Sequence, residues 1–160
     1  MVDAPRPEPV VPAGWHVVTP RLVAKGASEL VAFISVVFDA DVAAVGDGPS
    51  IVAIGDSKLM VSEAGTRPPS LAFLHVYVAD ADAVHDRALA HGATSLEPPL
   101  DTPYGDRRCM FEDGWGNVWQ AAVHGEAKRD AGPASGPRGL PHRCQQSGGA
   151  ALALHSAGFP

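Results

Sequence analysis

The sequence predicts an α+β fold in which two βαβββ modules pack into one domain. Short runs of alternating apolar and polar residues lie on either side of two stretches with helical spacing. The two halves also repeat: LVAKGASEL aligns with VYVADADAV, and IGDSKLMV aligns with GWGNVWQA. A repeat of about fifty residues that occurs only twice is too short for a solenoid and indicates a pair of modules.

The first module is predicted over residues 15–66. TPRLVAK begins it as a strand, and a helix follows with Ser28 as the candidate N-cap. One helical face carries Leu30, Phe33, Ile34, Val37 and Phe38. The β-branched Ile34, Val36 and Val37 would also suit a strand. DADVAAV is the next strand, and IVAIG and LMVSEA form a hairpin around Gly55 and Asp56.

The second module is predicted over residues 70–124. LAFLHVYV is its first strand, and the helix after it has Asp80 or Asp82 as the N-cap and Gly92 as its end. A short strand follows the helix. DRRCMFED and NVWQAAVH are two further strands around the turn Gly114-Trp115-Gly116-Asn117.

Composition limits the class of protein and its partners. The chain has 160 residues, 46% of them hydrophobic, which suits a single domain. The longest apolar stretch, from Leu30 to Phe38, is too short for a membrane span. A net charge of −6 and the absence of a basic cluster argue against a nucleic-acid partner. Cys109 and Cys144 are expected to be free thiols, and Cys109 a buried one.

The two ends differ from the body of the chain. Residues 1–14 are rich in proline and residues 125–160 in glycine and proline, so we expect a disordered arm and a disordered tail. The start has neither the basic residues nor the apolar run of a secretory signal, which predicts a cytoplasmic protein.

Four strings carry a family resemblance: VVTPRLVAKGASELVAF, IGDSKLMVSE, LHVYVADADAVHDRALAHGA and YGDRRCMFEDGWGNVWQAAVH. Over residues 16–124 they resemble the glyoxalase/bleomycin resistance/dioxygenase superfamily, also called vicinal oxygen chelate, and most of all its small bacterial PhnB-like branch. The resemblance implies a cup-shaped mixed sheet with helices on the outside and a homodimer. Two positions depart from the family pattern: Phe33-Ile34 replaces a phenylalanine-tyrosine pair, and Asp113-Gly114-Trp115-Gly116-Asn117 lacks the proline of D-P-x-G-N.

The resemblance also locates a metal site. Metal-dependent members use four side chains, which correspond here to Thr19, Met60, Phe73 and Gln120. Only Gln120 is a good donor for a divalent ion, so we expect no metal and no other cofactor. A displaced site that uses His75, Gln120, His124 and Glu63 is the alternative, because two histidines and a carboxylate can hold a divalent metal such as ferrous iron.

Without a metal, the lining of the cup decides the function. Phe73, Met60 and Val118 offer apolar area, and Thr19, His75, Gln120 and Tyr104 offer hydrogen bonds, which together suit a small organic ligand with a flat apolar part.

Two arginines follow on a predicted strand. Arg107 and Arg108 alternate in direction, so at most one of them reaches the ligand. Arg107 is counted with the ligand-binding residues, and an ion pair with Asp106 or Glu112 is the competing expectation. Three further side chains are not expected at the ligand: Trp119 packs under a helix, and His85 and His91 are solvated.

Three functions follow from these observations. The first is metal-free binding of a small organic molecule, with no catalytic residue assigned. The second is a metal-dependent enzyme of the same superfamily: a glyoxalase-like lyase, an epimerase or a dioxygenase. The third is an interaction module that recruits a partner through residues 125–160.

Overall fold

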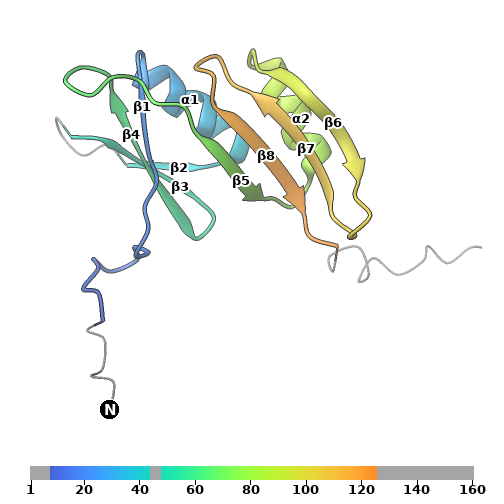
Figure 1. The fold of residues 1–160 in the computed structure, drawn as a ribbon, viewed down its shortest axis with the longest axis horizontal. Helices are drawn as coiled ribbons and strands as arrows, with labels where there is room; N and C mark the ends of the chain where they lie inside the picture. Colours follow the sequence, from blue (N-terminus) through green and yellow to red (C-terminus); the bar gives the residue numbers. More distant parts are fainter. Residues whose placement is uncertain (1–7, 44–47, 126–160) are drawn as a thin grey trace, which may run out of the picture.

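A computed structural model of the chain describes residues 8–43 and 48–125. It confirms the α+β fold and the repeated βαβββ order (Figure 1). The first module contains β1 (Arg21–Ala24), α1 (Ala27–Phe38), β2 (Asp41–Ala43), β3 (Ser50–Ile54) and β4 (Ser57–Glu63). The second contains β5 (Phe73–Tyr77), α2 (Ala81–Ala90), β6 (Thr94–Asp101), β7 (Arg107–Glu112) and β8 (Val118–Val123).

Each module forms its own four-stranded sheet. The strand orders are β1-β4-β3-β2 and β5-β8-β7-β6, so β1 and β5 are equivalent edge strands. β1 is parallel to β4 and β5 is parallel to β8, whereas the other neighbouring strands are antiparallel. Within the described ranges, an isolated bridge between Val23 and Ser70 is the one β-contact outside these strands. The cup expected from the resemblance is therefore two open sheets in a single chain.

The hydrophobic core is shared by the two modules. α1 packs on β1, β3 and β4 of its own sheet and also against α2. The Phe38 ring, at the end of α1, lies 5.0 Å from the Trp119 ring and 6.2 Å from the Phe111 ring. Trp119 is fully buried, as predicted. Burial of these rings between α1 and the second sheet holds the modules together.

The two helices begin in different ways. In α2, Asp80 is the N-cap and accepts a hydrogen bond from Ala83 N at 3.0 Å, which confirms one of the two candidates. In α1 the expectation of Ser28 is wrong, because the N-cap is Gly26 and no side chain caps it locally. Instead, the Glu63 carboxylate at the end of β4 accepts from Gly26 N at 3.0 Å and Ala27 N at 2.8 Å. A carboxylate from a neighbouring strand thus satisfies the free N–H groups of the helix.

The turn before β8 closes without the proline: Asp113 N donates to Asn117 O at 2.9 Å, and Gly116 has a φ of +85°. The expectation that His85 is solvated is wrong, because His85 is buried between α2 and β6 and lies 2.8 Å from Ser95 Oγ. His91 is exposed, as expected.

The ends of the chain extend beyond the described part. Residues 8–14 form neither helix nor strand. The remainder of the arm, residues 1–7, and nearly all of the tail, residues 126–160, lie outside the described residues, so the expected disorder there stays a prediction. Neither of the two described helices has the length and apolar character needed to cross a membrane.

Candidate functional site

The second sheet turns one side to the helices and leaves the other side uncovered. In the β5–β8 pair, Phe73 lies beside Val118 and His75 beside Gln120. Because side chains alternate along a strand, these four residues and Tyr77 point to the same side, which we call the free face. Phe73 is 62% exposed there and Tyr77 64%. Large rings left in solvent on a contiguous surface mark a place where another molecule binds.

The polar groups of the free face orient one another. His75 Nδ1 lies 2.7 Å from Gln120 Oε1, and an amide oxygen only accepts, so the Nδ1–H of His75 donates. The His75 ring meets Tyr77 edge to face, with 4.7 Å between the centroids. Tyr77 meets His124 in the same manner at 6.2 Å. His75, Tyr77 and His124 therefore form a row of three rings, which we call the ring row.

A buried carboxylate orients His124 at the end of the ring row. His124 Nδ1 and Gly125 N each lie 3.0 Å from Asp106 Oδ1, and Asp106 is only 7% exposed. Thr102 holds Asp106 in turn, because its hydroxyl accepts from Asp106 N and donates to Asp106 O, both at 2.9 Å. The turn between β6 and β7 thus determines where the His124 imidazole points.

Sequence reasoning did not find this arrangement. It considered His124 only as a metal ligand and Asp106 only as a partner of an arginine. The register of the β7–β8 hairpin could have brought them together: Arg107 pairs with Val123, and Asp106 and His124 stand one position beyond that pair.

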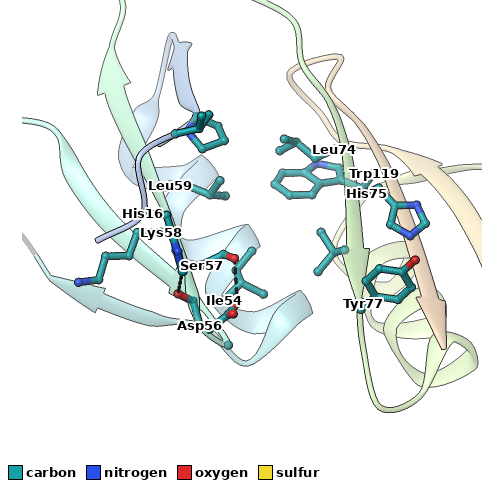
Figure 2. Close-up of a pocket in the computed structure, with 14 residues that line it drawn as sticks. His16, Ile54, Asp56, Ser57, Lys58, Leu59, Leu74, His75, Tyr77 and Trp119 are labelled. Atoms are coloured by element: carbon teal, nitrogen blue, oxygen red, sulfur yellow. Dashed lines mark hydrogen bonds between the residues drawn. The ribbon is translucent and has the colours of Figure 1, made fainter. Parts of the chain in front are cut away.

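A cleft of about 410 Å³ opens between the modules alongside β5 (Figure 2). One wall is the segment before β1 together with the β3–β4 hairpin, and the other wall is β5 with Trp119 behind it. Leu59, Leu74, Lys58 and Tyr77 are among the residues that line the cleft, and so is Trp119, which was not expected at the ligand. The volume lies in the range of small-molecule pockets, roughly 300–1,000 Å³.

The first-module wall of the cleft is held together by two contacts. His16 Nε2 lies 2.9 Å from Asp56 O, and Lys58 Nζ lies 5.0 Å from the centroid of the Trp15 ring. These contacts attach the segment before β1 to the hairpin. His75 and Tyr77 line the cleft as well as the free face, because β5 is an edge strand. The cleft and the free face are therefore continuous.

Most of the predicted ligand-binding residues separate into two groups. Phe73, His75, Val118 and Gln120 lie together on the free face. Thr19 and Met60 belong to the first module. Met60 pairs there with Arg21, which corresponds to the pairing of Gln120 with His75 in the second module. Tyr104 lies in the turn between β6 and β7 and is 66% exposed. No strand pairing joins the two sheets across the cleft within residues 8–43 and 48–125.

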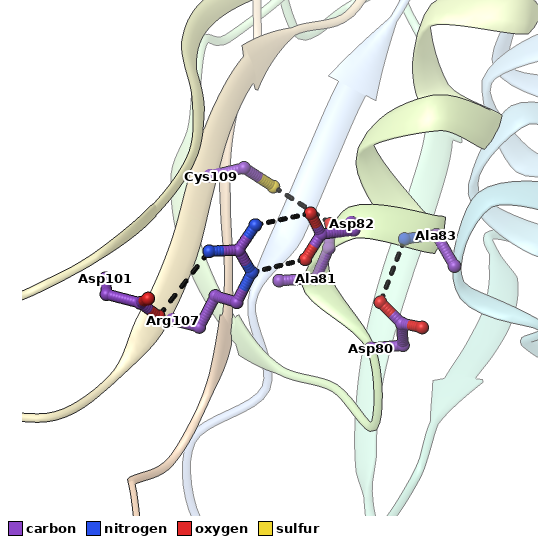
Figure 3. A network of polar contacts seen from close by, with 7 residues as sticks. All are labelled: Asp80, Ala81, Asp82, Ala83, Asp101, Arg107 and Cys109. Carbon is purple, nitrogen blue, oxygen red and sulfur yellow. Dashed lines mark hydrogen bonds and ion pairs between the residues drawn. The ribbon is translucent and has the colours of Figure 1, made fainter. Parts of the chain in front are cut away.

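Arg107 lies on the opposite side of the second sheet from the ligand-binding residues. It faces α2, where its Nε and Nη2 bind the two carboxylate oxygens of Asp82 at 2.5 and 2.6 Å (Figure 3). Asp101 adds a contact at 3.5 Å. The hydrogen bonds from Arg107 lower the pKa of the Asp82 carboxyl and raise that of the guanidinium. Arg107 was expected to contact the ligand or to pair with Asp106 or Glu112. It does neither and instead binds Asp82 through a fork of two hydrogen bonds, because strand alternation turns it toward the helix.

Arg108 is the arginine that shares a side with the free face. It stands opposite Ala122, which in turn pairs with Tyr77. Its Nη2 lies 3.0 Å from Glu97 Oε2, so its charge is balanced by a neighbour on β6. The expected pairing with Asp106 or Glu112 is therefore wrong for Arg108 too.

The residues present do not fit a divalent metal. Three of the four positions that the family uses are Thr19, Met60 and Phe73, which are poor or unsuitable donors. In the displaced set, Glu63 is bound to the start of α1, and these backbone hydrogen bonds lower its pKa. His124 is bound to Asp106. Among the described residues, no three His, Cys, Asp or Glu side chains converge as metal ligands would.

Comparison with known proteins defines the class. Residues 16–121 match the model of the Glyoxalase/Bleomycin resistance protein/Dioxygenase superfamily, so the chain belongs to that superfamily. The match spans both modules and agrees with the resemblance seen in the sequence. It does not distinguish the PhnB-like branch.

Several solved structures share the fold. TioX from Micromonospora sp. ML1 is 21% identical with a TM-score of 0.57, and 66% of this chain covers 96% of TioX. A glyoxalase/bleomycin resistance protein from Streptomyces sp. CB03234 is 27% identical with a TM-score of 0.52, and 64% of this chain covers 96% of it. A superfamily enzyme from Burkholderia phytofirmans PsJN is 18% identical with a TM-score of 0.55, and 66% of this chain covers 95% of it. No curated protein matches the chain in sequence.

Proposed function

We propose that the protein binds a small organic molecule with a flat apolar part on the free face of its second sheet, without a metal ion. The observation that carries this proposal is the exposure of Phe73 and Tyr77 on either side of the fixed His75–Gln120 pair. The two rings offer apolar area to a flat ligand, and the polar pair between them supplies direction.

The surroundings support binding rather than metal chemistry. The adjacent cleft adds about 410 Å³ of largely apolar space in which a ligand can extend. The metal positions of the superfamily hold side chains that pack against organic groups better than they ligate ions, as Met60 and Phe73 illustrate.

Elemental mass spectrometry combined with a fragment screen tests the proposal. Protein purified without chelators and then offered iron, zinc, manganese and nickel should hold none of them stoichiometrically. Aromatic fragments should bind, as seen by ligand-observed NMR, and Phe73→Ala should weaken them severalfold, whereas Leu89→Ala on α2 should not. Near-stoichiometric metal that is lost in His75→Ala would overturn the proposal in favour of a metal-dependent lyase, epimerase or dioxygenase.

We further propose that the protein is a homodimer in which a second copy covers the free face. A single chain leaves Leu71, Phe73 and Tyr77 between 62% and 75% exposed, and its two sheets stay open. A second copy would shield these side chains from bulk solvent and supply the opposing wall of a closed cup, with the ligand held between the two walls. Sedimentation of the full chain tests this, with a monomer at micromolar concentration as the contrary result.

A further inference from the structure

The ring row has a feature that binding of a generic aromatic molecule does not require. Each of its two imidazoles is tied through Nδ1 to an acceptor: His75 to Gln120 Oε1 at 2.7 Å and His124 to Asp106 Oδ1 at 3.0 Å. A carboxylate and an amide oxygen only accept, so Nδ1 carries the proton in both rings. In the neutral imidazole, Nε2 then has a lone pair and can only accept.

Both Nε2 atoms remain available to a ligand. In the described part of the chain, neither of them has a hydrogen-bond partner. The side chain of His124 is 61% exposed, and His75 is exposed as well. Tyr77 stands between the two imidazoles and presents its ring to solvent. The ring row thus offers two acceptors on either side of an aromatic surface.

The charges around the ring row do not favour an anion. The nearest cation on the same side of the sheet, Arg108, is paired with Glu97. Lys58, across the cleft, lies over the Trp15 ring. Asp106 adds a negative charge directly behind His124. Among the described residues, a carboxylate or phosphate at the ring row would therefore meet acceptor lone pairs, and the arginine on that side of the sheet, Arg108, is already paired.

We propose that the ring row recognises the hydroxyl of a neutral phenol, whose O–H donates to an imidazole Nε2 while its ring stacks beside Tyr77. This inference rests on the proposed function and names the ligand class of the same face. Phenols combine a flat apolar body with a hydroxyl that is a strong hydrogen-bond donor, which meets both requirements of the ring row. Asp106 acts here as a positioning residue, because it reaches the ligand only through His124.

Matched probes test the hydroxyl. Methyl para-hydroxybenzoate and methyl para-methoxybenzoate share the same ring and ester, and the second carries a methyl group in place of the donated hydrogen. Calorimetry with the full chain should give about tenfold tighter binding of the hydroxyl compound. Equal affinity for the two probes would overturn the inference and leave the proposed function intact. Failure of both to bind would overturn the inference, and failure of the whole aromatic screen would remove the proposed function with it.

Variants and a ligand-free measurement test the residues. His124→Phe and His75→Phe keep a flat ring and should each reduce the preference for the hydroxyl probe, whereas His91→Phe on α2 should leave the preference unchanged. Asp106→Asn should reduce it as well, because an amide also permits the other tautomer of His124. In the unliganded protein, nitrogen-15 NMR of the imidazoles should show Nδ1 protonated in His75 and His124. An Nε2-protonated form of both rings would overturn the proposal even in a protein that binds the probe.

Discussion

The buried carboxylate of Asp113 accepts a hydrogen bond from the indole Nε1 of Trp119 at 2.8 Å. The same carboxylate accepts from Trp115 N, Asn117 N and Asn117 Nδ2, each at 2.9 Å. Asn117 in turn accepts from Ala72 N, just before β5. One side chain therefore ties the turn before β8 to the central tryptophan of the core and, through Asn117, to the strand that carries the candidate site.

Asp113→Ala should lower the free energy of unfolding by about 3 kcal/mol, because it leaves several buried donors without an acceptor. Trp119→Phe removes one donor to the Asp113 carboxylate, and this loss alone should lower the free energy of unfolding less than Asp113→Ala does, because Asn117 still donates to the carboxylate. The smaller ring also leaves a gap beside Phe38, which adds a packing cost. Urea denaturation measures both. Asp86→Ala, an exposed position on α2, is the matched control, and a loss for Asp113→Ala no larger than for this control would contradict the prediction.

Asp82 should make stability depend on pH in the acid range. The Arg107 fork holds the pKa of Asp82 below its ordinary value of 3.8. A carboxyl whose pKa is lower in the folded state stabilises the fold above its unfolded pKa, and this contribution is lost as the pH falls through the folded pKa. Asp82→Asn should therefore be less stable than the wild type near neutral pH, and the difference should shrink below about pH 4.

The effect of Asp82→Asn should be smaller than that of Asp113→Ala, since the Asp82 side chain is 48% exposed and solvent screens the pair. Denaturation at a series of pH values measures it, with Asp86→Asn on the same helix as the control. A difference between wild type and Asp82→Asn that persists undiminished in strong acid would argue against the Arg107 pairing as its source.

Cys109 should react slowly with alkylating reagents. Its side chain is fully buried, and burial raises the pKa of the thiol to about 11. Little thiolate exists near neutral pH, and the thiolate is the reactive form. In a Cys144→Ser background, mass spectrometry should find Cys109 unmodified by iodoacetamide in the native protein and modified after denaturation. Rapid native labelling would show that the site opens easily or that the thiol is activated.

Phe73→Glu should shift the protein from dimer to monomer. Phe73 projects from the free face, and a charge there would be buried without a partner when a second copy covers it. Sedimentation equilibrium measures the change, and Leu89→Glu on α2 is the control for an added charge elsewhere. Thermal unfolding of Phe73→Glu should show an intact fold, since the side chain is mostly exposed in the single chain. An unchanged dimer would place the interface on another surface.

Glu63 should act on stability and not on metal content. Glu63→Ala removes the acceptor for Gly26 N and Ala27 N, so the melting temperature should fall, and Glu63→Gln should recover part of the loss because its amide oxygen still accepts. Elemental analysis of wild type and variants should give the same low metal content. A metal present in the wild type and absent in Glu63→Ala would restore the displaced metal site.

The sequence by itself determined the fold class and, for most residues of the second sheet, the side of the sheet that each side chain faces. Strand alternation suffices to assign these sides, since Phe73, His75 and Gln120 must share a side once β5 and β8 pair in register. The same alternation placed Trp119 in the core. The internal repeat determined the βαβββ order, because equivalent strings form equivalent strands.

Tertiary structure alone decided two of the polar contacts. Arg107 binds Asp82 and not a ligand, and Glu63 holds the start of α1. Each pair joins residues well separated along the chain, and periodicity carries no information about which polar groups meet across an interface of sheet and helix. The separation of the two sheets has the same origin, because their relative placement depends on how α1, α2 and Trp119 pack and not on the pattern within either module.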